Sequence, residues 1–276
     1  MKNIIILGSN GKIGKAFLSC KKNYYNIHSD LDNKIDKLLS IEFLKNNNVD
    51  LILNCIGSTK NKSLFFHSNF FVPLSIAKSL NKLSLINDKK IIFIHLSSIG
   101  VNDPYGRLSI SQIDLKVEQR SFLNFNKYEM SKCSADYVIR NLLNKNEKVR
   151  TYILQPSVII EKKSQFLKKV FFFLLLLPFS LPANSSPPIT KIEYLISYLD
   201  NIIKNETDNS PKNKGYVNTL QVFERIPLLK LFPTYKYISF FKLPIKKGNF
   251  DKLIKLVPNF FPFSSFKRIL IFLLFI

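Results

Sequence analysis

Two residues with acid–base potential, Tyr128 and Lys132, stand four positions apart in the segment NKYEMSKCSADYVIRN. On a helix, that spacing places both side chains on one face at neighbouring positions. A tyrosine hydroxyl normally ionises near pH ~10, and a nearby ammonium group favours the phenolate and lowers its pKa. The pair could therefore exchange a proton with a substrate hydroxyl or carbonyl near neutral pH. Lys132 could also bind a cofactor ribose.

A third candidate, Ser98, directly follows the apolar run KIIFIHL and Ser97, which is its neighbouring alternative. Open α/β sheets bind their ligands at the carboxyl ends of parallel strands, so this hydroxyl could hold a substrate oxygen. Each feature alone has a structural explanation, because Tyr-x-x-x-Lys arises by chance in helices and paired serines often cap them. The order and spacing of the three residues favour a catalytic role for Ser98, Tyr128 and Lys132.

A glycine-rich turn, Gly8-x-x-Gly11-x-x-Gly14, lies between a strand-like run and a helix-like run. Glycines at these places permit a tight turn, close approach of the backbone to a pyrophosphate, and close packing of helix on strand. The helix N-terminus then faces the negative charge. The turn predicts a site for NAD or NADP, with Asn10 and Lys12 as further candidate contacts.

Asp30 lies 22 residues after the first glycine, where the second strand should end. An acidic residue at that place would hold the hydroxyls of the adenosine ribose. A solvated loop aspartate is an equally good interpretation, and Asp32 and Asp36 are nearby alternatives. The segment has no Arg that would demand a 2′-phosphate, whereas His28 and Ser29 leave NADP open.

Strand and helix patterns alternate over the first ~160 residues, which predicts a parallel sheet. The expected strands are 2–7, 25–28, 50–55, 90–96 and 151–155. The expected helices are 11–20, 40–47, 68–83 and 128–143. After residue 160 the chain becomes rich in Phe, Pro and Lys, with a helix expected at 192–203 between loops at 184–188 and 205–215.

Composition narrows the class of protein. The net charge of +22 comes mostly from Lys, and it suits an anionic partner such as a nucleotide diphosphate or an acidic membrane face, or simply a solvated surface. Few Arg residues and the lack of a recognisable motif argue against nucleic acid. Three scattered cysteines suit reduced thiols in a cytoplasmic protein and show no metal spacing, and the N-terminus does not resemble a secretory signal.

Two apolar runs of eight residues, 170–177 and 269–276, are each too short to span a bilayer, which takes ~20 residues. For the first run we favour a buried core element or pocket wall. The second, together with four nearby phenylalanines and interspersed lysines, could contact the inner face of the cytoplasmic membrane through 260–276. An oligomer interface or a core element is an equal alternative. The four phenylalanines are Phe260, Phe261, Phe263 and Phe266.

The chain resembles the short-chain dehydrogenase/reductase superfamily, in its extended or atypical branch of NAD-dependent epimerases and dehydratases that modify sugar nucleotides. The resemblance covers about the first 160 residues. Its matching segments are GSNGKIG at 8–14, NCIG at 54–57, HSNFFVPLSIAKSL at 67–80, HLSSIGV at 95–101, YEMSK at 128–132 and QPSVI at 155–159. The segment KIDKLLSIEFLKNNNVDLILN also looks like dTDP-4-dehydrorhamnose reductases.

The resemblance implies Ser98, Tyr128 and Lys132 as the catalytic residues. It implies Gly8, Gly11, Ile13 and Gly14 at the pyrophosphate, and Cys55, Ile56 and Gly57 along the cofactor. It places Asn69 in the helix behind the site, and Pro156 and Val158 near the nicotinamide. The implied fold is a Rossmann-type, doubly wound parallel α/β sheet over 1–160, with a smaller, mostly helical substrate region over 161–276.

The implied function is an NAD(P)-dependent oxidoreductase or epimerase for a nucleotide-sugar or polyprenyl-linked sugar in polysaccharide biosynthesis, in a family whose members are often homodimers. Two departures leave the reaction open: Val101 is followed by Asn-Asp-Pro-Tyr-Gly, and Gln155 replaces the usual Arg. A non-enzymatic, dinucleotide-binding subunit of a membrane complex and a lipid or steroid dehydrogenase are the alternatives.

Overall fold

The computed structural model describes residues 1–59, 61–85, 89–101, 127–161, 179–180, 188–205, 217–225 and 243–244. These residues belong to two compact units. The first comprises the described parts of Met1–Pro104, Asp114–Pro156 and Ile192–Val222. The second comprises the described parts of Ser157–Lys191 and Phe223–Ile276.

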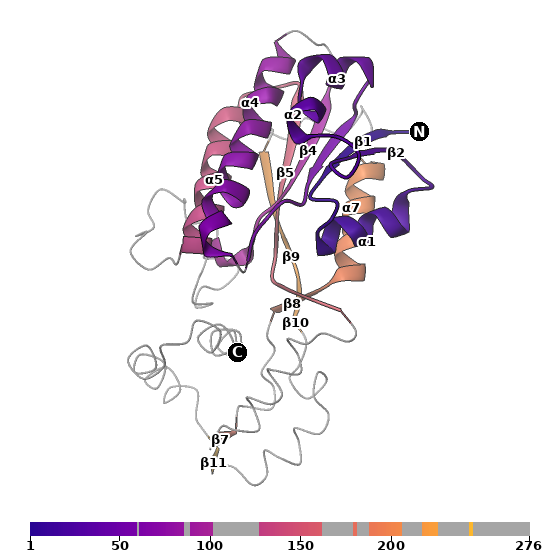
Figure 1. The fold of residues 1–276 in the computed structure, drawn as a ribbon. Helices are drawn as coiled ribbons and strands as arrows, with labels where there is room; N and C mark the ends of the chain where they lie inside the picture. The colour runs from indigo at the N-terminus through magenta and orange to yellow at the C-terminus, as the bar shows by residue number, and fades with distance from the viewer. Residues whose placement is uncertain are drawn as a thin grey trace. The chain divides into compact units, whose positions relative to one another are not determined.

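A six-stranded parallel sheet forms the centre of the first unit (Figure 1). In chain order its strands are β1 (Asn3–Leu7), β2 (Asn26–Ser29), β3 (Leu51–Asn54), β4 (Ile91–Leu96), β5 (Val149–Pro156) and β9 (Val217–Val222). Their spatial order is β2-β1-β3-β4-β5-β9, and every neighbouring pair runs parallel. The doubly wound parallel sheet predicted from the sequence is therefore confirmed.

The direction of the strand order reverses at β1. The chain first adds β2 on one side of β1 and then adds β3 on the other side. In doubly wound folds, ligands bind outside the carboxyl ends of the strands at such a reversal. The topology therefore directs attention to the loops that follow β1 and β3.

Helices cover both faces of this sheet, which explains why its inner strands are apolar on both sides. Helix α1 (Lys12–Lys21) contacts α7 (Ile192–Asn205) on one face, and α4 (Val72–Ser84) contacts α5 (Lys127–Leu143) on the other (Figure 1). Two short helices, α2 (Ile35–Leu38) and α3 (Ile41–Asn46), connect β2 to β3. All four residues of β3 are buried, as are four of the five residues of β1.

The largest cluster of buried side chains lies between the sheet and the α4–α5 layer. Its fully buried members include Ile5, Leu7, Ile52, Ile76, Leu80, Phe93, Ile139, Leu143 and Ile153. Each such side chain removed from water contributes on the order of 1.5–3 kcal/mol to folding. This packing fixes α5 against the sheet, and α5 carries Tyr128 and Lys132.

Short strands make up the described part of the second unit. Strand β8 (Pro188–Lys191) pairs in parallel with β6 (Val158–Ile160) and antiparallel with β10 (Glu224–Arg225). A separate parallel pair joins β7 (Phe179–Ser180) to β11 (Leu243–Pro244). Ser157 is held within this unit, because its amide donates to Thr190 Oγ1 at 3.0 Å and its hydroxyl donates to the Pro188 carbonyl.

The expected strands and helices all occur, with ends that differ by at most two residues, except that the helix expected from residue 68 begins as the π-helical turn His67–Phe71 and becomes α-helical at Val72. The sequence patterns missed α2, β9 and the short strands β6, β7, β8, β10 and β11. They also assigned 192–203 to the C-terminal region, whereas α7 and β9 complete the first unit. Residues 170–177 and 260–276 lie outside the described residues, as do nearly all of the two expected loops. Within the described ranges, no helix has both the length and the apolar character needed to cross a bilayer.

Candidate active site

The first turn after β1 depends on glycine for steric reasons. Gly8 has φ +81°, a conformation that side chains disfavour, and a Cβ on it would lie 2.6 Å from the Ile56 amide nitrogen. A Cβ on Gly14 would overlap the carbonyl oxygen of Gly8. The turn and the first turn of α1 are thus pressed against each other and against the chain after β3. This is the close backbone approach that the sequence pattern predicts.

The N-terminus of α1 is suited to an anion. Gly11 is the N-cap residue, it has no side chain to cap the helix, and its amide donates to the Gly8 carbonyl at 2.9 Å. The first backbone N–H groups of a helix have no partner within the helix, and they carry the positive end of its dipole. Asn10 and Lys12 are exposed beside this turn, and Ile13 is half-buried. These features fit a pyrophosphate group.

Asp30 directly follows β2, and its carboxylate organises the glycine turn. Oδ2 accepts the amide of Gly8 at 2.8 Å, and Oδ1 accepts the amide of Ser9 at 2.9 Å and the Ser9 hydroxyl. A carboxylate offers about four acceptor sites, so Oδ2 retains capacity for a further hydroxyl donor. The structure thus gives Asp30 a role in shaping the turn, and the ribose contact stays a prediction.

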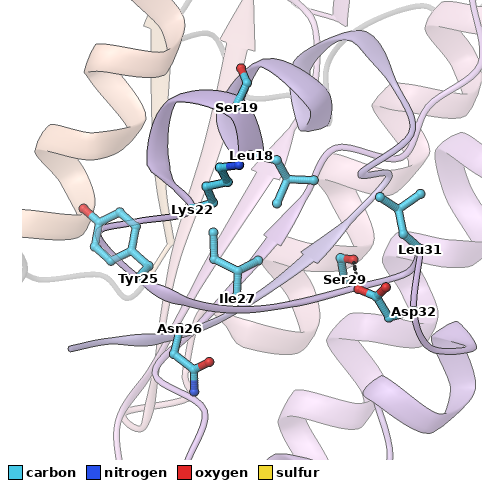
Figure 2. Close-up of a pocket in the computed structure, with 9 residues that line it drawn as sticks. All are labelled: Leu18, Ser19, Lys22, Tyr25, Asn26, Ile27, Ser29, Leu31 and Asp32. Atoms are coloured by element: carbon cyan, nitrogen blue, oxygen red, sulfur yellow. Dashed lines mark hydrogen bonds between the residues drawn. The ribbon is translucent and has the colours of Figure 1, made fainter.

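A hollow of about 610 Å³ lies beside the edge strand β2 and α1 (Figure 2). Within it, the Ser29 hydroxyl donates to Asp32 at 2.8 Å, which explains the position of this alternative acidic residue. Its lining residues are Leu18, Ser19, Lys22, Tyr25, Asn26, Ile27, Ser29, Leu31 and Asp32. None of the predicted catalytic residues lines this hollow.

The chain after β3 continues the path that starts at the glycine turn. The Cys55 amide donates to the Leu7 carbonyl at 2.8 Å. The segment Cys55, Ile56 and Gly57 therefore starts beside the end of β1. Asn69 lies buried in a π-helical turn (η2, His67–Phe71) that precedes α4. Its side chain binds both the amide and the carbonyl of Ser58, at 2.9 and 3.0 Å. Asn69 therefore fixes the loop immediately after Gly57.

Lys132 reaches this loop from α5. Its ammonium donates to the Leu96 carbonyl at 2.7 Å, and a Cβ built on Gly57 would lie 3.2 Å from Nζ. Burial lowers the pKa of Lys132 to about 8, although the negative charge of Asp136 partly offsets this effect. Lys132 is therefore mostly an ammonium ion at neutral pH, but neutral pH lies only about one unit below its pKa. The structure places Lys132 beside the chain that follows β3.

Tyr128 lies one turn earlier on α5, half-buried, with its ring packed edge-on against Phe65 at 5.7 Å between centroids. Ser98 lies two residues after Leu96, whose carbonyl binds Lys132. The Ser98 hydroxyl accepts a hydrogen bond from the Gly100 amide at 3.3 Å. Ser97 is buried and donates to Asp136 instead, at 2.8 Å. Of the two serines, Ser98 is the more accessible, which supports its choice as the catalytic candidate.

A buried polar cluster beneath Lys132 was not predicted from the sequence. Asp136, one turn after Lys132, accepts hydrogen bonds at Oδ2 from Ser97 and from Gln155 Nε2. His95 lies on the other side of Asp136, with Nε2 3.8 Å from Oδ1. The spacing Lys132-x-x-x-Asp136 on one helix face was the available signal. The contribution of β4 and β5 could not be read from local sequence.

The remaining predicted contacts divide between the units. Gly8, Asp30, Cys55 and Lys132 form a continuous series along the carboxyl ends of β2, β1, β3 and β4. Pro156 ends β5, at the same edge of the same sheet. Val158 belongs to the second unit, in β6. Among the described residues, no group of His, Cys, Asp and Glu side chains could hold a metal ion.

Comparison with known proteins gives structural matches alone: no protein-family model matches the sequence, and no curated protein does so either. The NADP complex of dTDP-4-dehydrorhamnose reductase from Bacillus anthracis has a TM-score of 0.54 at 16% identity, covering 89% of this chain and 85% of its own. The Yersinia enterocolitica dTDP-4-dehydrorhamnose reductase gives 0.56 at 18%, covering 91% and 86%.

The UDP-glucuronic acid 4-epimerase from Bacillus cereus, in complex with NAD, has a TM-score of 0.55 at 15% identity, and the match covers 88% of this chain and 87% of the epimerase. At such identities a structural likeness shows the fold. The chain therefore has the doubly wound α/β fold of these reductases and this epimerase.

Proposed function

We propose that this protein is an NAD(P)-dependent reductase or epimerase that acts on a sugar nucleotide. The structural neighbours with the same fold include a dTDP-sugar reductase bound to NADP and a UDP-sugar epimerase bound to NAD. A shared fold does not fix a function, so the residues of the site carry the argument. The observation that carries it is the buried Lys132 ammonium beside Gly57, with Ser98 and Tyr128 on the adjoining segments.

The dinucleotide would bind along the series of loops at the carboxyl edge of the sheet. The glycine turn and the start of α1 would hold its pyrophosphate, and Asp30 would accept a hydroxyl of its adenosine ribose. Lys132 would donate to the second ribose, near Gly57. When bound, the nicotinamide supplies a hydride donor or acceptor.

The protein's own residues would handle the proton that accompanies this hydride. Tyr128 would exchange its hydroxyl proton with the substrate oxygen, and Ser98 would hold that oxygen by a hydrogen bond. The Lys132 ammonium would favour the phenolate of Tyr128, since a positive charge lowers the pKa of a nearby phenol. These roles need Lys132 in its charged form, which a pKa of about 8 permits at neutral pH.

The first test is mass spectrometry of small molecules released from the purified, denatured protein. Stoichiometric NAD supports an epimerase or dehydratase, which returns the hydride to the same sugar. NADPH that binds only when it is added supports a reductase. Absence of dinucleotide binding under either condition would refute the assignment of the glycine turn.

Turnover of dTDP- and UDP-sugars by Tyr128→Phe then separates an enzyme from a non-enzymatic dinucleotide-binding subunit. A loss of two orders of magnitude or more, with cofactor affinity retained, is expected for an acid–base residue. Unchanged turnover would contradict the role of Tyr128. A preference for lipid alcohols over sugar nucleotides would favour the lipid or steroid dehydrogenase.

The lipid-linked form of the substrate, the membrane contact through 260–276 and a homodimer remain predictions from the sequence. Vesicle flotation with anionic and neutral lipids would test the membrane contact, and light scattering would test the dimer. A protein that stays with the soluble fraction on anionic vesicles would contradict the membrane prediction.

A further inference from the structure

The polar cluster beneath the site is unusual because it buries charge away from the atoms proposed to react. Asp136 and His95 are almost fully buried, at 1% and 0% exposure. An ionised carboxylate in such a place is costly unless hydrogen bonds or an opposite charge compensate it. Asp136 has both kinds of compensation: hydrogen bonds from Ser97 and Gln155, and the positive charges of Arg140 and Lys132.

The hydrogen-bond directions in the cluster fix the state of His95. The Asn54 side chain accepts the Ile56 amide at Oδ1, so its Nδ2 faces His95 Nδ1 as a donor at 3.0 Å. Nδ1 is then an acceptor, which places the single proton of a neutral ring on Nε2. Burial and the charge of Lys132 lower the pKa of His95 well below its usual value, so the ring is neutral.

The carboxylate of Asp136 is only half satisfied by hydrogen bonds. Among the described residues, neither its Oδ1 nor His95 Nε2 has a hydrogen-bond partner, although the two atoms face each other. A buried acid kept for hydrogen bonding alone would be expected to use both oxygens. The arrangement therefore favours a role for the charge of Asp136.

Three other titratable groups interact electrostatically with Lys132 or Asp136 and carry no negative charge at neutral pH. They are Arg140 on α5, the neutral His95 on β4, and Cys55 after β3, whose thiol pKa burial raises to about 12. Asp136 is the negative group that most raises the pKa of Lys132. It stands four residues after Lys132, on the same face of α5.

We propose that Asp136 is a positioning residue that acts through Lys132: its buried carboxylate, held by Ser97 and Gln155, is the counter-charge that keeps the Lys132 ammonium protonated. Only the use of the ammonium, to bind the cofactor ribose and favour the Tyr128 phenolate, rests on the function proposed above. Burial raises the pKa of Asp136 to about 6, against the lowering effect of Ser97 and Gln155, and Lys132 titrates near 8. Both charges are thus present together between about pH 6 and pH 8.

The test follows the Lys132 side chain directly, in protein labelled with ¹³C at lysine Cε, by recording its NMR shift against pH. The resonance is identified by its loss in Lys132→Arg. In Asp136→Asn the titration should move to lower pH by about one unit or more, because an opposite charge has been removed. Asp136→Glu, which restores the charge, should recover most of that shift.

Asp200→Asn is the matched control, because Asp200 is also a buried carboxylate but lies on α7 with other partners. Its removal should leave the Lys132 titration unchanged. An unchanged titration in Asp136→Asn, or an equal shift in Asp200→Asn, would overturn the proposal.

The wild-type protein provides a second test that needs no buried substitution. The same Lys132 resonance should show a small additional inflection near pH 6, where Asp136 ionises, and Ser97→Ala should move that inflection to higher pH. A single inflection near pH 8, unaltered by Ser97→Ala, would refute the coupling. Neither readout uses cofactor or turnover, so a lack of dinucleotide binding would refute the proposed function without altering this result.

Discussion

Two glycines, Gly14 in the first turn of α1 and Gly100 after β4, differ in what a side chain would meet, and substitution can exploit that difference. A Cβ on Gly14 would overlap the Gly8 carbonyl, whereas a Cβ on Gly100 would have ordinary contacts at 3.6 Å. We expect Gly14→Ala to cost about 1–3 kcal/mol of stability, the usual cost of overpacking, and to weaken NAD(P) binding more than tenfold. Calorimetric titration and thermal unfolding measure the two effects.

Gly100→Ala is the control for the stability effect and should change the unfolding free energy by less than about 0.5 kcal/mol. Equal stability and equal cofactor affinity in Gly14→Ala and the parent protein would show that the turn can relax around a methyl group. That result would contradict the close packing of turn and helix.

The three cysteines should differ in their reactivity toward alkylating reagents. Burial raises the pKa of the Cys55 thiol to about 12, so it stays protonated and weakly nucleophilic at neutral pH. Cys20 is exposed and Cys133 is buried. Brief treatment of the native protein with iodoacetamide at pH 7.4, followed by peptide mass spectrometry, should label Cys20 well before the other two. Cys55 is partly exposed, so preferential labelling of Cys55 would contradict the raised pKa of its thiol.

At the scale of elements, one buried carboxylate attaches α7 to α1 and to Tyr25, which directly precedes β2. Asp200 accepts hydrogen bonds from Tyr25 at 2.5 Å and from Lys21 and Lys204 at 2.8 Å. Burial by itself would raise the pKa of Asp200, but these hydrogen bonds prevail and lower it to about 2. The side chain is 8% exposed, so the interaction is little screened by solvent.

The pH dependence follows from that lowered pKa. The ionised carboxylate stabilises the fold fully above the pKa of an unfolded aspartate, ~3.9, and this stabilisation is lost as the pH falls toward the folded pKa of about 2. Asp200→Asn should therefore lose about 2 kcal/mol at pH 7 and reduce the difference between pH 7 and pH 3. Urea unfolding at both pH values measures this, and an Asp200→Asn protein with the parent's pH dependence would contradict the assignment.

Lys204→Ala is a milder comparison, since the Lys204 side chain is 57% exposed and exposed ion pairs contribute little. We expect a loss below about 1 kcal/mol. A larger effect than that of Tyr25→Phe, which removes a buried donor, would show that the exposed lysine rather than the buried tyrosine attaches the helix.

At the scale of the whole molecule, the first unit is assembled from separated stretches of sequence. Strand β9 pairs with β5 from Thr151–Val217 to Pro156–Val222, and α7 buries Leu195, Leu199 and Ile203. A fragment ending at residue 161 would lack both elements. We expect it to bind a hydrophobic dye and to melt without cooperativity, whereas the full chain melts cooperatively. Cooperative melting of the fragment would support an independent domain over 1–160.

The sequence predicted the parts of this unit that depend on local pattern. The short apolar strands, the glycine turn and the Tyr128–Lys132 spacing are all recognisable within windows of a few residues. Strand β9 was missed because VNTLQV is half-buried and mostly lacks a strongly apolar face, and its pairing with β5 is distant in sequence. The Asp136 cluster was missed for a similar reason, since α5, β4 and β5 each supply part of it.

The late position of β9 also bears on how a cell would make the protein. At a synthesis rate of 5–20 residues per second, the interval between completing β5 at Pro156 and reaching Val222 is on the order of 10 s. Throughout that interval the outer backbone edge of β5 has no strand beside it. Exposed edges template pairing between chains, so nascent polypeptides of this protein are expected to be vulnerable to association on polysomes, and slowing translation should prolong that vulnerability.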